Sequence, residues 1–135
     1  MAFSADDFIG RAIVLNCELH DRAFRELRLG HLDLARELFA RGRQQVFSNG
    51  WDGFVPFVCV AGAALAAAEA DHRRAARLIG VADAAFTALG QMPDPNDDAE
   101  LAAARRGAIG ALGPAGFAAE YAHGRALDPR TAFGA

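Results

Sequence analysis

The sequence predicts an all-α fold of about six helices arranged as helical hairpins. Apolar residues recur every three or four positions along most of the chain, which is the period of a helix, and no segment alternates convincingly with period two. Glycine-containing turns and proline divide the chain into segments of helical length. The clearest example lies within 61–90, where six apolar residues fall on one helix face: Ala75, Leu78, Ile79, Ala82, Phe86 and Leu89.

Length and charge narrow the class of protein. The 135 residues fit a single domain over 1–135. The net charge is -3, whereas a protein that binds phosphate groups usually has an excess of positive charge, so we expect no direct nucleic-acid partner. The longest uncharged run, 53–68, contains Pro56 and falls short of the roughly 18 apolar residues that a membrane span needs. No signal-peptide pattern opens the chain. The expected setting is therefore cytoplasmic, without a membrane.

Two cysteines, Cys17 and Cys59, lie in apolar helical segments. A buried, reduced thiol is the common state of a cysteine in such a segment. The sequence therefore predicts two free, buried thiols in place of a disulfide.

The first predicted hairpin covers about 7–48. Its first helix ends at Leu29-Gly30, and its second helix, about 31–47, ends at Ser48-Asn49-Gly50, residues that tolerate the left-handed backbone of a helix stop. The inward stripe of the first helix comprises Ile9, Ala12, Ile13, Asn16, Leu19, His20, Ala23, Phe24 and Leu27. That of the second comprises Ala35, Leu38, Phe39, Gly42 and Val46.

The second predicted hairpin covers about 51–90 and contains the core helix. Trp51 and Phe54 precede this helix, and Pro56 fits only near its first turn. It runs to Glu69 and is apolar nearly all round, so we expect other helices to cover it on several sides. A fourth helix, about 71–89, completes the hairpin.

The third predicted hairpin, about 97–127, follows a proline-containing loop. Asn96 or Asp97 is expected to cap its first helix, and Gly113-Pro114 to begin its second. Its first helix points Leu101, Ala104, Ala108 and Leu112 inward, and in the second Phe117 and Tyr121 share a face. Asp128-Pro129 is typical of the start of a seventh, short helix.

An internal similarity links the second and fourth helices. Four small or apolar residues recur at an offset of forty: Gly30 and Ala70, Ala35 and Ala75, Phe39 and Ile79, Gly42 and Ala82. Recurrence at one offset predicts two copies of a helix-turn-helix unit, and such units bury their apolar faces by stacking.

The spacing of these residues is similar to the turn and second helix of a tetratricopeptide repeat. The segment 70–83 more specifically resembles the C-terminal, MalT-like repeats of LuxR-type and related ATPase-containing bacterial transcriptional regulators. Further matching features follow in the family's order: Phe86, Leu89-Gly90, Pro93 and Pro95, Leu112-Gly113, Phe117-Ala118-Ala119 and Gly124-Arg125-Ala126-Leu127. The resemblance covers about 65–127. It implies an α-solenoid that binds a protein partner or the other domains of a larger regulator, and it carries over no enzymatic activity or cofactor.

Catalytic and metal-binding motifs are weak in this sequence. With no lysine there is no phosphate-binding G-x-x-x-x-G-K, and no serine stands in G-x-S-x-G. Ala76, Gly80 and Phe86 have the spacing of a DNA-binding helix-turn-helix, but the candidate recognition helix is short and acidic. A calcium loop starting at Asp94 would need glycine where Ala99 stands. Helix packing and helix capping explain these residues better, and we expect no enzyme, metal or cofactor.

The resemblance implies a groove lined by the first helix of each hairpin. Its candidate partner-binding residues are Cys17, His20, Phe24, Arg28, Phe57 and Val60. A polar residue satisfied at a helix interface is the alternative interpretation of His20.

Two other functions stay open. An apolar pocket around Trp51, Phe54 and Phe57 would instead bind a small effector. Open ends of a helical stack would favour self-association into a homodimer.

Overall fold

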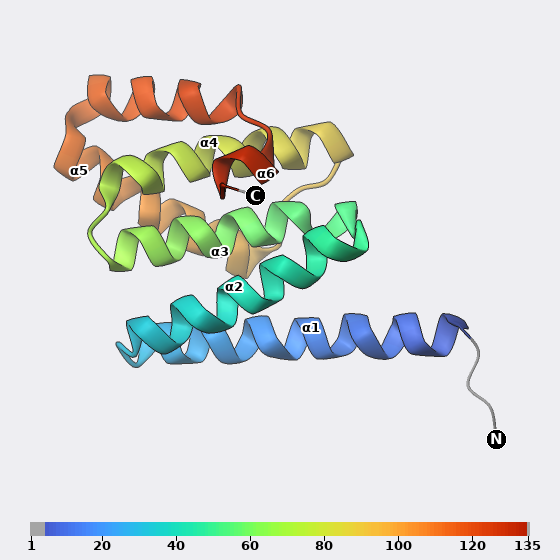
Figure 1. Ribbon diagram of the computed structural model, residues 1–135. Coiled ribbons are helices and arrows are strands. Elements are labelled where there is room, and N and C mark those ends of the chain that lie inside the picture. The colour runs from blue at the N-terminus through green and yellow to red at the C-terminus, as the bar shows by residue number, and fades with distance from the viewer. Residues whose placement is uncertain (1–4, 135) are drawn as a thin grey trace.

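The computed structural model describes residues 5–134 and is helical almost throughout (Figure 1). The elements are α1 (Ala5–Arg28), α2 (Leu32–Asn49), the 3-10 helix η1 (Asp52–Phe54), α3 (Val55–Ala68), α4 (His72–Leu89), α5 (Pro95–Arg125) and α6 (Pro129–Ala132). Residues 5–134 contain six α-helices and no strand, which confirms the predicted all-α class. No helix in this range is both long and apolar enough to cross a bilayer.

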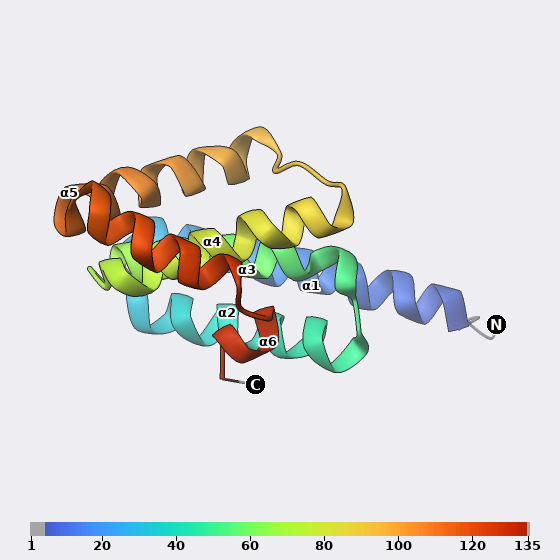
Figure 2. The same ribbon diagram turned by 90° about the horizontal axis from the view of Figure 1, so that it is seen from above.

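Helix α3 lies at the centre of the molecule. It contacts α2 on one side and α4 and α5 on the other, and α1 packs mainly on α2 (Figures 1 and 2). This position explains why the sequence of α3 is apolar all round. Its buried residues are Pro56, Val58, Cys59, Val60, Ala61, Ala63, Ala64, Leu65 and Ala66.

Helix α5 is broken near its middle, and its two halves fold back on each other (Figure 2). At Gly113 the backbone takes φ 77° and ψ 163°, values outside the helical region, and Pro114 follows. The two halves correspond to the predicted fifth and sixth helices, and α6 corresponds to the predicted seventh.

The predicted cap of α5 needs a correction. Asp94, and neither Asn96 nor Asp97, is the N-cap, and its side chain accepts a hydrogen bond from the backbone N–H of Asp97 at 2.8 Å. Pro95 explains the difference, because its fixed φ suits the first helical position and its missing N–H is not needed there.

The turns that precede α2 and α4 have the same backbone geometry forty residues apart. Gly30 and Ala70 both have positive φ, at 82° and 59°. The next residue donates its N–H to a carbonyl five residues earlier in each turn, His31 to Glu26 and Asp71 to Ala66, both at 2.9 Å. The tetratricopeptide relationship itself stays a prediction.

Helix α4 and the second half of α5 cross at two glycines. A Cβ added to Gly80 would lie 2.2 Å from the carbonyl oxygen of Tyr121, and one added to Gly124 would lie 1.9 Å from that of Arg77. Backbone therefore packs directly on backbone at this crossing. Gly80 thus serves helix packing, the interpretation favoured over a DNA-binding turn.

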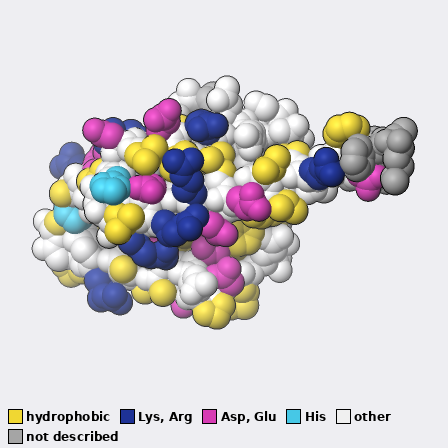
Figure 3. All heavy atoms as spheres, turned by 90° about the horizontal axis from the view of Figure 1, so that it is seen from below, with side chains coloured by type: hydrophobic (Ala, Val, Ile, Leu, Met, Phe, Trp, Pro, Cys, Tyr) yellow, Lys and Arg dark blue, Asp and Glu magenta, His cyan; other side chains and the backbone are white. Residues whose placement is uncertain are grey.

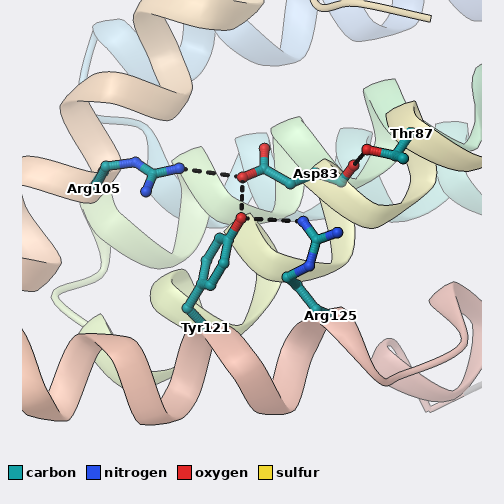
Figure 4. A network of polar contacts seen from close by, with 5 residues as sticks. All are labelled: Asp83, Thr87, Arg105, Tyr121 and Arg125. Atoms are coloured by element: carbon teal, nitrogen blue, oxygen red, sulfur yellow. Dashed lines mark hydrogen bonds and ion pairs between the residues drawn. The ribbon is translucent and has the colours of Figure 1, made fainter. Parts of the chain in front are cut away.

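A polar network centred on Asp83 of α4 joins both halves of α5 (Figure 4). Arg105, from the first half, lies 3.2 Å from Asp83 Oδ2. Tyr121, from the second half, donates its hydroxyl to the same oxygen at 2.6 Å, and Arg125 donates to the Tyr121 oxygen at 3.2 Å. One carboxylate thus holds the broken helix in register with α4.

The predicted apolar faces are wrong at two positions. Leu89 is 42% exposed at the end of α4, although the other five residues of its stripe are buried. Ile9 is 51% exposed, because α1 extends beyond the part of its length that α2 covers, as Figures 1 and 3 show. Periodicity identifies a face of a helix, but it does not show how far a neighbour covers it.

Candidate functional site

A cleft of about 730 Å³ lies between α1, the start of α3 and the start of α5. We call it the α1 cleft. Its lining residues are Asn16, Cys17, His20, Asp21, Phe24, Arg25, Arg28, Phe54, Phe57, Asp94, Asn96, Asp97 and Glu100. Figure 3 views the molecule from the side of α1, where arginines and carboxylates intermingle on the surface.

The α1 wall of the cleft follows one face of the helix. Cys17, Asp21, Phe24 and Arg28 are spaced by three or four residues, so they lie in a row. Phe24 is fixed by an edge-to-face contact with Phe39 of α2, with ring centroids 4.9 Å apart. The wall therefore presents a fixed aromatic ring between polar groups.

Two phenylalanines connect the cleft to the core. Phe54 ends η1 and Phe57 lies in the first turn of α3, and their ring centroids are 6.4 Å apart. Phe57 in turn makes an edge-to-face contact with the buried Phe86 of α4, at 5.8 Å. Phe57 is thus held on its inner side by the core residue Phe86, and Phe57 and Phe54 both line the cleft.

The opposite wall of the cleft is acidic. Asp94, Asp97 and Glu100 come from the first residues of α5 and the residue that caps it. Burial raises the pKa of Asp97 to about 6, and the neighbouring carboxylates of Asp94 and Glu100 add to the shift. Arg28 pairs with Glu100 across the cleft at 3.2 Å. No described cation is among the groups that shift the pKa of Asp97, so this carboxyl has no positive charge beside it to offset the burial.

His20 and Asn16 fix α1 to α2 at the inner edge of the cleft. A Cβ on Gly42 would lie 2.9 Å from Nε2 of His20, so the imidazole occupies the space left by the glycine. Burial lowers the pKa of His20, which favours the neutral ring. Asn16 donates from Nδ2 to the carbonyl of Gly42 and to Oε1 of Gln45, both at 3.0 Å. His20 therefore belongs to the helix interface as well as to the cleft.

The cleft brings together most of the residues named from the sequence. Cys17, His20, Phe24, Arg28 and Phe57 all line it, and their role in binding stays a prediction. Val60 is a correction, because it is 1% exposed and packs in the core. The sequence could not exclude Val60 from the groove, since α3 is apolar on every side.

The acidic wall could not be predicted from the sequence. In the sequence, Asp94 stands out only as the start of an incomplete calcium loop, and Asp94 and Glu100 lie about seventy residues from the α1 wall. No local pattern reports such a long-range contact. Of the three residues of the predicted effector pocket, Phe54 and Phe57 line the cleft. Trp51 packs beside Phe47 and Val58, with its ring edge-to-face on Phe54 at 6.3 Å. Binding of an effector stays a prediction.

The two cysteines differ in exposure. Both thiols are free, but Cys17 is exposed, contrary to the prediction, because it faces the cleft and not α2. Cys59 is buried in α3, and burial raises its pKa to about 12. Within residues 5–134, no group of three or more His, Cys, Asp and Glu side chains is placed to hold a metal ion.

Comparison with known proteins identifies no relative of this chain. No protein-family model matches it. No curated protein and no solved structure matches it either. The family resemblance in the helical hairpins therefore stays a prediction.

Proposed function

We propose that this chain is a non-catalytic interaction or signal-receiving module of a bacterial transcriptional regulator, which binds a segment of a protein partner in the α1 cleft. The observation that carries the proposal is the cleft itself. Three segments distant in sequence combine there to present aromatic rings between charged walls. Interfaces draw most of their affinity from such aromatic groups, with charged groups setting orientation.

The cleft favours a partner segment that carries an apolar anchor next to a basic residue. The anchor would pack against Phe24, Phe54 and Phe57. The basic residue would pair with Asp97, whose raised pKa reflects burial beside other carboxylates. Because the positive charge favours the ionised form of Asp97, we expect binding to strengthen as the pH rises through about 6.

Cys17 offers a direct test of this site. Its thiol is exposed in the cleft, whereas Cys59 is buried with a raised pKa, so a maleimide photo-crosslinker attaches selectively at Cys17. Irradiation in a lysate of the source organism should link the chain to one protein. Binding of that protein, once purified, should weaken by about 1–3 kcal/mol in Phe24→Ala and Phe57→Ala, with melting curves confirming that both variants fold.

A matched control places the same crosslinker outside the cleft. The variant Cys17→Ser with Ala119→Cys carries its thiol at an exposed position in the second half of α5. Equal crosslinking from both positions, or unchanged affinity in both phenylalanine variants, would contradict the proposal. Asp97→Asn should weaken binding and remove its pH dependence near pH 6 without removing any apolar contact.

The size of the cleft favours a second candidate function, binding of a small effector. Its volume of about 730 Å³ lies within the range of roughly 300–1,000 Å³ typical of small-molecule sites. An effector should raise the melting temperature of the wild-type chain and lose that effect in Phe54→Ala. A compound panel that raises no melting temperature, together with a specific crosslink at Cys17, would favour the protein partner.

A further inference from the structure

The residues that follow α5 form a segment that packs against α2, α3 and α4, outside the α1 cleft. Helix α6 contacts α4 (Figure 1). Phe133, just after α6, packs against both the core around Leu78 and the cluster around Val46. Phe54 packs against the same Val46 cluster and also lines the α1 cleft, but Phe133 itself does not line the cleft, and its contact does not depend on the function proposed there. It shows which kind of peptide this face accepts.

Phe133 occupies a notch that exists because residue 62 is a glycine. A Cβ added to Gly62 would lie 2.8 Å from Cε1 and Cζ of the Phe133 ring. Arg43 of α2 and Arg74 of α4 place their guanidinium carbons 4.7 Å and 5.7 Å from the ring centroid. The Gly62 notch, defined by Gly62, Arg43 and Arg74, therefore receives one aromatic ring between two cations.

Arg130 provides a second anchor for the same segment. Its Nη2 donates to the carbonyl oxygen of Phe47 at 2.7 Å, and its guanidinium carbon lies 4.8 Å from the Phe47 ring centroid. Asp128 orders the turn between the helices by accepting from the N–H of Thr131 at 3.3 Å. The segment is thus bound in the manner of a peptide ligand, by an arginine and a phenylalanine three residues apart.

The notch has positive charge that residues 127–134 do not neutralise. Among residues 5–134, the guanidinium groups of Arg43 and Arg74 form no ion pair with a carboxylate. Burial and the nearby charge of Arg74 both lower the pKa of Arg43, which shows that its charge is poorly compensated. Residues Thr131, Ala132 and Gly134, which flank the ring, carry no charge.

We propose that the Gly62 notch is a second protein-binding site, which takes a partner segment containing a phenylalanine next to a carboxylate, and that Phe133 occupies it in cis until such a partner displaces it. The partner's ring would replace that of Phe133. Its carboxylate would pair with Arg43 and Arg74, a contact that residues 127–134 do not make. Arginine favours carboxylates because its planar group donates two parallel hydrogen bonds.

Two fluorescein-labelled peptides with blocked ends test the proposal. The first carries residues 127–134 with Gly134→Gln, and the second carries the same residues with Gly134→Glu, so both place a side chain at the positive φ of Gly134 (74°) and differ only in charge. Fluorescence anisotropy measures their binding to the full chain and to the full chain with Phe133→Ala, in which the notch is vacated. Phe133→Ala should bind the glutamate peptide roughly tenfold more tightly than the glutamine peptide, and roughly tenfold more tightly than wild type binds the glutamate peptide.

Two further variants locate the binding at the notch. In the Phe133→Ala background, Gly62→Ala should weaken both peptides roughly tenfold, because its methyl group fills the space for the ring. Arg43→Gln with Arg74→Gln should remove the preference for the glutamate peptide. Circular dichroism checks that these variants stay helical. Equal affinity of the two peptides for Phe133→Ala, or equal affinity of wild type and Phe133→Ala for the glutamate peptide, would overturn the proposal.

Discussion

Two glycines determine how closely α4 approaches the second half of α5. At Gly80 and Gly124 the space for a Cβ is already filled by backbone atoms of the other helix. A backbone atom cannot move aside as the end of a flexible side chain can, so any added group must separate the helices. This close helix crossing thus depends on residues that contribute no side chain.

Gly80→Ala should therefore lower the free energy of unfolding by about 2–3 kcal/mol, because the new methyl group would overlap the Tyr121 carbonyl. Gly110→Ala is the matched control, since that glycine also lies in a helix but an added Cβ would have nothing within 4 Å of it. Alanine is the better helix former, so this control should gain up to about 1 kcal/mol. Urea unfolding measures both. Equal effects at the two positions would contradict the close crossing.

Asp97 should make the stability of the chain fall as the pH rises from about 4 to about 6. Burial, followed by the charges of Asp94 and Glu100, raises its folded pKa to about 6, above the ordinary aspartate value of 3.8. Between these values the unfolded chain loses the proton that the folded chain keeps, so ionisation favours unfolding.

Asp97→Asn should consequently raise the free energy of unfolding at pH 7 by about 1 kcal/mol, a value reduced for the partial solvent exposure of the site, and change it little at pH 4. Urea unfolding at the two pH values measures the difference. Asp98→Asn is the control, because Asp98 is an exposed neighbour on the same helix turn. A gain of the same size at pH 4 as at pH 7 would argue against a raised pKa at Asp97.

At the scale of single helices, the sequence predicted most of the structure. Local signals determine where a helix starts and ends: the positive-φ Gly50 and Gly90 end α2 and α4. The cap of α5 was misplaced by two or three residues because Asp94, Asn96 and Asp97 are all good capping residues. Only the position of Pro95 distinguishes them.

The recurring turn before α2 and α4 makes a prediction at the same scale. Ala70 holds φ 59°, a left-handed conformation in which a Cβ is strained, whereas the equivalent residue forty positions earlier is Gly30. Ala70→Gly should raise the free energy of unfolding by about 1 kcal/mol, and Gly30→Ala should lower it by a similar amount. Thermal melts of both variants check the pair. A loss of stability in Ala70→Gly would show that the two turns are not equivalent.

At the scale of the whole molecule, sequence patterns stop being sufficient. They predicted that α3 would be covered on several sides, but they could not assign a neighbour to each side, and Val60 was therefore placed in the groove although it is buried. The α1 cleft and the Gly62 notch both join residues that lie tens of positions apart. Periodicity describes one helix at a time, so it cannot predict contacts between residues of different helices.

Cys59 makes the integrity of this assembly measurable. It lies in the central helix with 0% exposure, and burial raises its pKa to about 12, so the thiol stays protonated and unreactive at pH 8 in the folded chain. Because α2, α4 and α5 all contact α3, we expect Cys59 to react with a thiol reagent only when the whole molecule opens.

In a Cys17→Ser background, the free energy of opening calculated from the labelling rate of Cys59 should therefore equal that from urea unfolding within about 1 kcal/mol. Adding Gly80→Ala should lower both values by the same amount, because the crossing of α4 and α5 would then open in the same transition that frees α3. Labelling that is fast in the folded chain, or insensitive to Gly80→Ala, would show that α3 becomes accessible by local opening. The hairpins would then be separate cooperative units, as in a stack of repeats in which each unit contacts only its neighbours.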